Sequence, residues 1–277
     1  MKGTLYVVGT PIGNLRDITL RAIDTLREAD RIVAEDTRRT RALLSHLGIQ
    51  GKPLEAVEAH ASEQRIARVV QHLLEGETIA LVTDAGMPSI SDPGTALLRE
   101  ALRAEVPVTV VPGPSAVTAA VALSGLVTGP FFFVGFLPRA GTARKDALAR
   151  LASCPEPCVL FEAPNRLKAS LADLAELMPT REVAVGRELT KLHEEVLRGT
   201  VAELAAVDRE YLGEVTMVLG PGPSAAETEA IDDAAVDARI DEELKKGASA
   251  KDAAHRVAAW SGRPRREVYA RVLERKG

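Results

Sequence analysis

Leu5-Tyr6-Val7-Val8-Gly9-Thr10-Pro11-Ile12-Gly13-Asn14-Leu15 is a short apolar run that ends in a turn rich in glycine and proline. A helical pattern follows from about Thr19. A strand that hands over to a helix through such a turn is typical of open α/β sheets, and these sheets bind ligands at the carboxyl ends of their strands. The stretch therefore predicts an α/β fold with a ligand loop after its first strand.

The turn departs from the loop of dinucleotide-binding proteins. That loop has the pattern Gly-x-Gly-x-x-Gly, in which the second glycine lets a pyrophosphate approach the backbone. Pro11 occupies this position, and a proline has no N–H group to donate to a phosphate. The loop is therefore expected to bind a ligand that presents no pyrophosphate.

Composition narrows the class of protein. The chain has 277 residues, 46% of them hydrophobic, which suits one large or two medium domains and a tail. Its net charge of −4 gives no global attraction to nucleic acid, so such a partner needs a local basic patch. Aromatic residues make up 3%, too few for a wide base-stacking platform. The cysteines and histidines show no metal-ligand spacing, and we expect no metal centre.

Two features bear on targeting. The first residues lead directly into a strand and lack the pattern of a signal peptide. The uncharged stretch from Val106 to Pro138 is broken by prolines and glycines, whereas a membrane-spanning helix needs about 20 unbroken apolar residues. We expect this stretch to form strands and a buried helix at the centre of a core, in a cytoplasmic protein without membrane contact.

Strands and helices alternate in the first half of the chain, as is typical of a parallel or mostly parallel sheet. In the first half we expect strands at 4–9, 31–35, 78–83 and 107–111, and helices at 19–29, 37–47, 62–75 and 94–104. After Pro130 we expect strands near 131–135, 157–162, 182–186 and 214–219, and helices near 143–153, 165–177 and 200–209. This predicts an N-terminal α/β domain at 1–113, a C-terminal α/β domain at 114–222, and an acidic linker with a basic helical tail at 223–277.

Two further loops follow strands of the first domain. Asp84, Gly86 and Met87 come after the third strand, where a carboxylate can accept hydrogen bonds and a glycine permits close approach. Ser115 and Ala116 open a helix after the fourth strand, so Ser115 is either a helix N-cap or a ligand donor. Three loops at one edge of a sheet predict a concave ligand site.

Charged residues follow other strands. Glu35 and Asp36 end the second strand, where an acid in a dinucleotide fold would hold the ribose. Arg38 follows them and faces either an anionic substrate or solvent. In the second half, Arg187–Glu195 is a dense charged stretch that suits either substrate handling or ion pairing.

The tail is expected to form short helices. From Arg239 to Gly277 it carries eleven Lys or Arg against six Asp or Glu. Two helices around the turn Ser261–Pro264 resemble a helix-turn-helix. A helical lid with solvated faces is one interpretation, and the other is contact with nucleic acid through Lys251, Arg263, Arg265 and Arg266.

Several segments taken together resemble one family, the bacterial 2′-O-methyltransferases of small-subunit ribosomal RNA within the tetrapyrrole methylase superfamily. The matching segments are Gly9–Leu15 with Asp17–Thr19, Ala34–Arg38, Asp84–Pro88, Asp92–Gly94, Pro112–Ala116, Gly135–Pro138, Phe161–Pro164 and Arg187–Lys191. They span residues 3 to 220, and the basic tail resembles the C-terminal extension of that family.

The resemblance implies a two-domain fold, usually dimeric, that binds S-adenosylmethionine in a cleft between its domains. Residue by residue, it implies cofactor contacts at Pro11, Ile12, Asp84, Gly86, Met87, Ser115 and Ala116, and at Phe161 and Glu162 of the second domain. The implied reaction methylates the ribose 2′-oxygen of a decoding-centre cytidine in 16S ribosomal RNA, within the small ribosomal subunit.

Such a reaction needs a general base within hydrogen-bond reach of the 2′-hydroxyl, while positioning supplies most of the rate. The candidates for the base are Glu35, Asp36, Glu188 and Lys191, and the sequence does not choose among them. We expect RNA contacts at Arg38, Arg187 and Lys191 in addition to the four basic residues of the tail.

Three other functions fit parts of the sequence. A methylase of the same fold that acts on a small tetrapyrrole would have no use for the basic tail. A nicotinamide-dependent oxidoreductase would use Glu35 or Asp36, but Pro11 argues against it. A non-enzymatic RNA-binding factor would leave the three converging loops unexplained.

Overall fold

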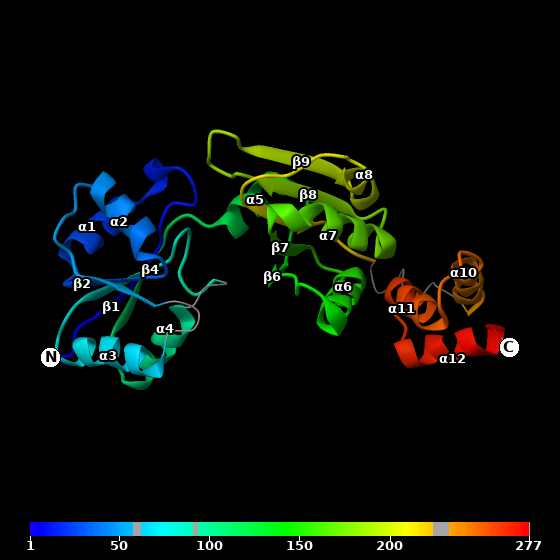
Figure 1. The fold of residues 1–277 in the computed structure, drawn as a ribbon, viewed down its shortest axis with the longest axis horizontal. Helices are drawn as coiled ribbons and strands as arrows, with labels where there is room; N and C mark the ends of the chain where they lie inside the picture. Colours follow the sequence, from blue (N-terminus) through cyan, green and yellow to red (C-terminus); the bar gives the residue numbers. More distant parts are fainter. Residues whose placement is uncertain (58–61, 91–93, 224–232, 277) are drawn as a thin grey trace. The chain divides into compact units, whose positions relative to one another are not determined.

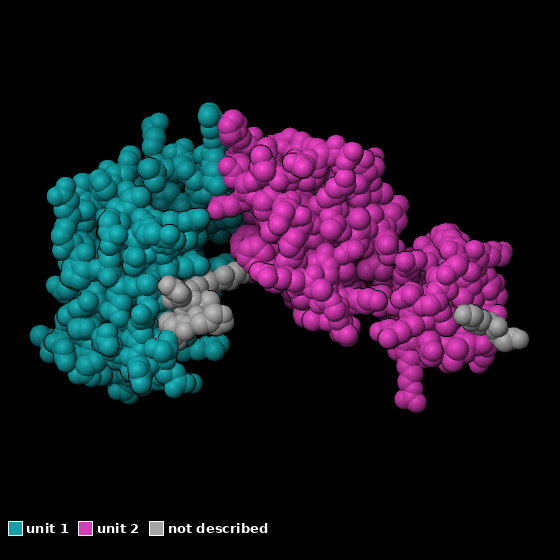
Figure 2. All heavy atoms as spheres, in the orientation of Figure 1, with its two compact units in different colours: residues 1–119, 189–192 teal, residues 120–188, 193–277 magenta. Residues whose placement is uncertain are grey.

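The computed structural model describes residues 1–57, 62–90, 94–223 and 233–276, and the chain divides into two compact units (Figures 1 and 2). Unit 1 consists of Met1–Ala119 with Leu189–Leu192, and unit 2 of Ala120–Glu188 with His193–Gly277. Most of the expected acidic linker, residues 224–232, lies outside the described residues. The expected domain boundaries at 113 and 222 remain predictions.

Unit 1 is built on a parallel five-stranded sheet with the strand order β3-β2-β4-β1-β5. The strands are β1 (Leu5–Val8), β2 (Arg31–Ala34), β3 (Leu54–Ala56), β4 (Ile79–Val82) and β5 (Val108–Val111). Leu5 of β1 pairs with Ile79 on one side and Val108 on the other. The central strand β4 is buried along its whole length, as expected for a parallel strand covered on both faces.

Helices cover both faces of this sheet (Figure 1). They are α1 (Leu20–Glu28), α2 (Thr37–His46), α3 (Glu63–Leu74) and α4 (Gly94–Arg103), while η1 (Leu15–Asp17) and α5 (Ala116–Ser124) follow β1 and β5. Because successive strand residues point to opposite faces, Ala80 packs in a cluster with Leu26 of α1, whereas Leu81 packs with Leu73 of α3 and Leu97 of α4.

Unit 2 contains a mixed sheet with the order β6-β7-β10-β8-β9, in which β6 and β7 are parallel and the other pairs antiparallel. Its elements are β6 (Phe132–Phe136), α6 (Gly141–Ser153), β7 (Cys158–Glu162), α7 (Pro164–Leu177), β8 (Glu182–Arg187), β9 (Glu195–Thr200), α8 (Val201–Ala205) and β10 (Val215–Leu219). Helices α6 and α7 pack on the sheet through residues such as Leu151 and Leu171.

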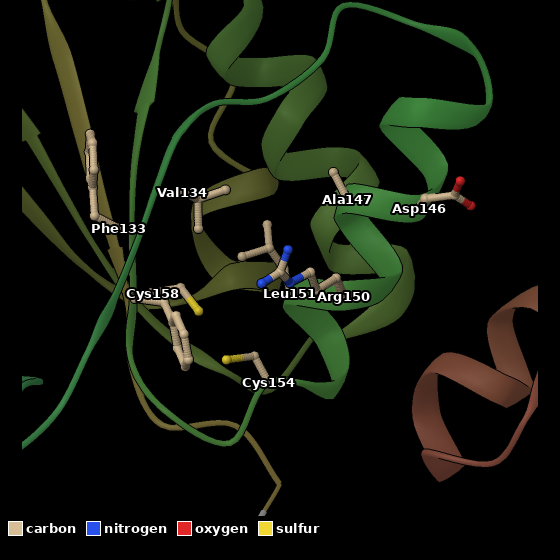
Figure 3. A pocket seen from close by; sticks show the side chains of 9 residues that line it. Phe133, Val134, Asp146, Ala147, Arg150, Leu151, Cys154 and Cys158 are labelled. Carbon is tan, nitrogen blue, oxygen red and sulfur yellow. The ribbon is translucent and has the colours of Figure 1, made fainter. Parts of the chain in front are cut away.

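A pocket of about 370 Å³ lies beside α6 and β6. Figure 3 shows Phe133 and Val134 of β6, Arg150 and Cys154 near the end of α6, and Cys158 at the start of β7. Burial raises the pKa of the Cys158 thiol to about 12, so this thiol stays protonated at neutral pH.

Three helices close the chain: α10 (Asp233–Lys245), α11 (Ala250–Ser261) and α12 (Arg265–Lys276). They enclose a small core of their own around Val236, Ile240, Val257 and Val268. Ser249 caps the start of α11, and Gly262 ends that helix with a φ of +68°. Helix α11 also contacts α6 and α7, which joins the tail to unit 2.

The structure confirms the α/β class and the alternation of the first half, but two strands were not predicted. Strand β3 has three residues, too few to show the alternation of apolar and polar residues that marks a strand in a sequence. Strand β9 lies at the edge of its sheet, and its half-buried and exposed residues show no alternating pattern of burial.

The expectation that the uncharged stretch lies at the centre of a core was wrong for both of its strands and for most of its helix. Strand β5 is an edge strand with Thr109 and Val110 exposed, and only Val117, Ala120 and Ser124 of α5 are buried. Strand β6 is an edge strand, and Phe132 and Phe136 are 48% and 55% exposed. An apolar sequence predicts that the side chains of a strand are buried, but it does not show whether elements of the same unit bury them.

None of the helices in the described ranges has the length and apolar composition needed to cross a bilayer.

The loops after β1 and β5 touch through Gly9 and Gly113. A Cβ atom at Gly9 would lie 2.7 Å from Gly113 Cα and 2.7 Å from Met87 Sδ. We expect Gly9→Ala to lower the free energy of unfolding by about 1–3 kcal/mol, because the loops must move apart. Urea unfolding measures this against Gly129→Ala, where no atom lies within 4 Å of the added Cβ. Equal losses in the two variants would contradict the close contact.

Candidate active site

Three loops of unit 1 meet at the carboxyl edge of its sheet. Thr10 and Gly86 form an isolated antiparallel bridge: the Thr10 N–H donates to the Gly86 carbonyl at 2.9 Å, and the Gly86 N–H to the Thr10 carbonyl at 3.1 Å. Gly86 has a φ of +81°, and a Cβ there would lie 3.4 Å from Ile12 Cγ2 and 3.5 Å from the Pro114 carbonyl oxygen. The structure thus brings together the loops that carry Pro11, Ile12, Asp84, Gly86, Met87, Ser115 and Ala116.

Asp84 links the β4 loop to the end of β2. Its Oδ1 accepts a hydrogen bond from the Asp36 N–H at 3.0 Å, and its Oδ2 lies 3.4 Å from Arg39 Nε. Burial, followed by the charge of Glu35, raises the pKa of this carboxyl. The Asp84 side chain is 22% exposed, so part of the carboxylate remains open to a ligand.

Two threonines continue this network. The Thr83 hydroxyl donates to Glu35 Oε2 at 2.7 Å, and the Thr10 hydroxyl donates to the Thr83 carbonyl at 3.1 Å. The β1 loop, the β4 loop and the end of β2 are therefore tied together by side chains as well as by backbone. Thr83 was not among the predicted site residues, because its role depends on contacts between distant segments.

A pocket of about 250 Å³ opens beside this network. Its lining comes from the β1 loop, α2 and the β4 loop, and consists of Thr10, Pro11, Leu15, Arg39, Thr40, Ala42, Leu43, Thr83 and Asp84. A mostly apolar lining with a few convergent polar groups is typical of small-molecule sites. The β1 and β4 loops thus line one pocket together with α2, and the ligand site predicted from all three loops stays a prediction.

The segment Leu189–Leu192 belongs to unit 1 and lies against the β1 loop. The Asn14 N–H donates to Thr190 Oγ1 at 3.0 Å, and a Cβ at Gly13 would lie 2.4 Å from Lys191 Cγ. Thr190 adopts a φ of +67°, a conformation that is rare outside glycine and is found at functional sites. Lys191 therefore lies beside the ligand loop, whereas Thr190 was missed because its strain has no signal in the sequence.

Asp36 is the N-cap of α2. Its Oδ1 accepts from the Arg38 N–H at 2.8 Å, and the Arg38 guanidinium donates to both carboxylate oxygens. These hydrogen bonds lower the pKa of Asp36 to about 2. Asp36 is therefore a weak base at neutral pH, while the Arg38 side chain remains 86% exposed.

The predicted cofactor residues of unit 2, Phe161 and Glu162, end strand β7. Glu162 is 2% exposed; its carboxylate accepts from the Ala163 N–H at 2.8 Å and from the Ser170 hydroxyl at 2.5 Å, and lies 3.3 Å from Arg166 Nε. This carboxylate is thus engaged in the interior of unit 2. Cofactor contact at this strand end stays a prediction.

The charged stretch that begins at Arg187 is also well paired in unit 2. Arg187 Nε lies 3.1 Å from Glu195 Oε2, and its guanidinium donates to the Leu212 carbonyl at 2.9 Å. Glu188 Oε1 accepts from the Glu214 N–H at 2.9 Å. Ion pairing, one of the two interpretations of this stretch, is therefore present for Arg187.

The basic residues of the tail fall into two groups. Arg263 forms ion pairs with Asp233 and Glu267. Within the described part of the chain, no ion pair or side-chain hydrogen bond is found for Lys251, Arg265 or Arg266, and all three are exposed. The described residues also contain no group of three His, Cys, Asp or Glu side chains placed to hold a metal ion.

Comparison with known proteins identifies the family. Residues 4–205 match the family described as Tetrapyrrole (Corrin/Porphyrin) Methylases. The chain therefore belongs to the tetrapyrrole methylase family, and it is a methyltransferase. Residues 230–276 match a second family, described as the RsmI C-terminal HTH domain.

Two relatives of the chain carry the same name. Ribosomal RNA small subunit methyltransferase I of Halalkalibacterium halodurans is 42% identical over 97% of this chain and 94% of that protein. The protein of the same name from Thermotoga maritima is 49% identical over 78% of this chain and 98% of that protein. Among solved structures, uroporphyrin-III C-methyltransferase from Thermus thermophilus, complexed with S-adenyl homocysteine, has a TM-score of 0.58 at 21% identity, covering 79% of this chain and 97% of that one.

The ion pairs of Glu195 predict a pH dependence of stability. Hydrogen bonds from Arg209 and Arg187 lower its pKa from 4.5 to about 2. Because the folded state holds this proton less tightly than the unfolded state, the stabilisation is present above about pH 4.5 and is lost as the pH falls toward 2. We expect Glu195→Gln to lower the urea midpoint at pH 7, with the difference shrinking through this window.

The control for this experiment is Glu210→Gln, which removes an exposed acid of the same unit. Its midpoint should follow that of the wild type at every pH. A Glu195→Gln deficit that is constant from pH 7 to pH 2 would contradict the assignment of the ion pairs.

Proposed function

We propose that this methyltransferase transfers a methyl group from S-adenosylmethionine to the ribose 2′-oxygen of a decoding-centre cytidine in 16S ribosomal RNA, within the small ribosomal subunit. One observation carries the proposal: the ligand loops of a methylase and a basic helical tail occur in one chain, which is similar over 97% of its length to a protein named for ribosomal RNA methylation. A methylase acting on a small tetrapyrrole would leave the tail unexplained.

The loop cluster of unit 1 fits S-adenosylmethionine. The partly exposed Asp84 carboxylate is suited to accept hydrogen bonds from ribose hydroxyls. Gly86 permits close backbone approach, and the pocket beside Pro11 offers apolar lining. When bound, the cofactor supplies an activated methyl group on a sulfonium. The same proposal includes Ile12, Met87, Ser115 and Ala116, and, from unit 2, Phe161 and Glu162.

We propose that Asp36 is the least suited of the four candidates for the general base, which leaves Glu35, Glu188 and Lys191. Asp36 binds a proton weakly because Arg38 holds its pKa at about 2, and a base works best with a pKa near the working pH. The Glu188 carboxylate accepts from a backbone N–H in unit 2. Glu35 accepts a hydrogen bond from the Thr83 hydroxyl, next to Asp84. Lys191 packs against Gly13 of the β1 loop.

For RNA binding we propose seven basic residues. In Arg38, Arg187 and Arg263 the guanidinium groups are held by neighbouring acids, so their contribution to RNA affinity should be the smaller. The proposal also includes Lys191, Lys251, Arg265 and Arg266.

The experiment that tests the function is transfer of labelled methyl from S-adenosylmethionine to small ribosomal subunits that lack their native methylations, followed by digestion to nucleosides. We expect label in 2′-O-methylcytidine, and a large loss of transfer in Asp84→Asn. No label in RNA, with cofactor binding intact by calorimetry, would overturn the RNA substrate and favour a small tetrapyrrole.

We also propose that the protein acts in the cytoplasm, with its ribosomal substrate, and as a homodimer. The support for a dimer is an apolar surface on α5 and β6, formed by Leu123, Phe132, Phe133, Val134 and Phe136, each 36–55% exposed. We expect a dimer in sedimentation velocity and a shift toward monomer in Phe132→Glu. The control is Leu212→Glu, at an apolar residue outside this surface that is 72% exposed. A monomeric wild type would contradict the dimer.

A further inference from the structure

A separate groove of about 310 Å³ lies within unit 2, along α6 and the two last helices. Its lining combines residues of α6 and its C-terminal end with residues of α11, α12 and the turn between them, and its polar members are Asp146, Arg150, Ser153, His255, Arg263 and Arg265. Helix α11 packs on α6, so both walls belong to one folded unit. The groove therefore joins the methylase fold to the tail.

Two cations in this groove are available to a ligand. Arg150 comes from α6 and Arg265 from the first turn of α12, and both are exposed. Among the residues that the structure describes, neither guanidinium has an ion pair or a hydrogen bond. Arg263 is different, since Asp233 and Glu267 hold it.

The groove has a positive balance of charge. Asp146 is its one acid, and Figure 3 shows that the Asp146 carboxylate points away from the two cysteines on the other side of α6. The pKa of half-buried His255 reflects the charges around it. Burial, followed by the positive charges of Arg265 and Lys145, lowers this pKa. The negative charges of Asp146 and Asp252 raise it, but by less. At neutral pH the groove therefore presents two guanidinium groups, an uncharged imidazole and the Ser153 hydroxyl.

We propose that this groove binds the phosphate backbone of RNA, with Arg150 and Arg265 each donating to phosphate oxygens. A guanidinium forms paired hydrogen bonds with phosphate, and arginines on two different elements can hold successive phosphates of one strand. The proposal rests on the proposed function for its choice of RNA. It extends the RNA surface from the tail onto α6, so the tail acts as one wall of a binding site and not as an independent module.

The test is the salt dependence of binding to unmethylated 16S ribosomal RNA in a filter-binding assay. The variant is Arg150→Gln/Arg265→Gln. Its matched control is Arg68→Gln/Lys245→Gln, which removes the same charge from two exposed side chains outside the groove. We expect the groove variant to bind RNA more weakly than the wild type. The slope of log affinity against log salt should become shallower by about 2, whereas the control should keep a slope near that of the wild type. Equal slopes for the two double variants would overturn the proposal.

Methyl transfer to small ribosomal subunits separates this proposal from the proposed function. In the groove variant we expect a raised KM for subunits with kcat and cofactor affinity near wild type. If the wild type transfers methyl to RNA while the groove variant keeps its KM and its salt slope, the groove proposal fails and the proposed function stands. If wild type transfers no methyl to RNA, the function fails, and the salt slopes still decide the groove.

The pKa of His255 gives a second readout that a purely structural role for the arginines would not produce. Bound phosphate places negative charge beside the imidazole, so RNA should raise this pKa in an NMR titration. The charged groups that face His255 are Lys145 and Asp146 of α6, Asp252 of α11 and Arg265 of α12. An unchanged pKa on saturation with RNA would contradict phosphate in the groove.

Discussion

The backbone contact between Gly9 and Gly113 is the constraint on which the candidate site depends. The two glycines end neighbouring parallel strands, and a side chain on either would push the loops apart. An added Cβ at Gly9 would also lie 2.7 Å from the Met87 sulfur, and one at Gly86 would lie 3.4 Å from Ile12 Cγ2. The bridge between Thr10 and Gly86 then gives the loops backbone partners that the sheet does not supply.

The charged groups of the site follow from this geometry. Asp84 and Glu35 are brought to one edge of the sheet, and each is held by a neighbour: Asp84 by Arg39 and the Asp36 N–H, Glu35 by the Thr83 hydroxyl. Groups fixed in this way need little reorganisation when a ligand arrives, which is how protein sites favour charge development in a reaction.

Much of the fold could be predicted from the sequence, because strands followed by Gly- or Pro-rich turns and helices repeat through the first half. The three ligand loops followed from their position after β1, β4 and β5. Thr190 could not be predicted, since it reaches the β1 loop only through tertiary contact. The exposed face of β6 was missed because an apolar pattern does not show whether other elements of the chain bury the strand.

The charges of the tail also could not be assigned to partners from the sequence. Arg263 and Arg265 are both arginines, lie two residues apart and line the same groove, yet Asp233 holds Arg263, whereas Arg265 has no ion pair within the described part of the chain. The net charge of a segment therefore does not show which of its basic side chains can bind a polyanion. The acids that neutralise Arg271 and Arg275 come from α10, so much of the basic character of the tail is internal.

Hydrogen exchange with and without S-adenosylmethionine tests whether the loops joined by Gly9 and Gly113 hold the cofactor. We expect slower amide exchange in residues 9–15, 83–90 and 112–116 when the cofactor is added, with α3 and α12 unchanged as internal references. Protection confined to segments outside these loops, in a sample that calorimetry shows to be saturated, would show that the cofactor binds elsewhere.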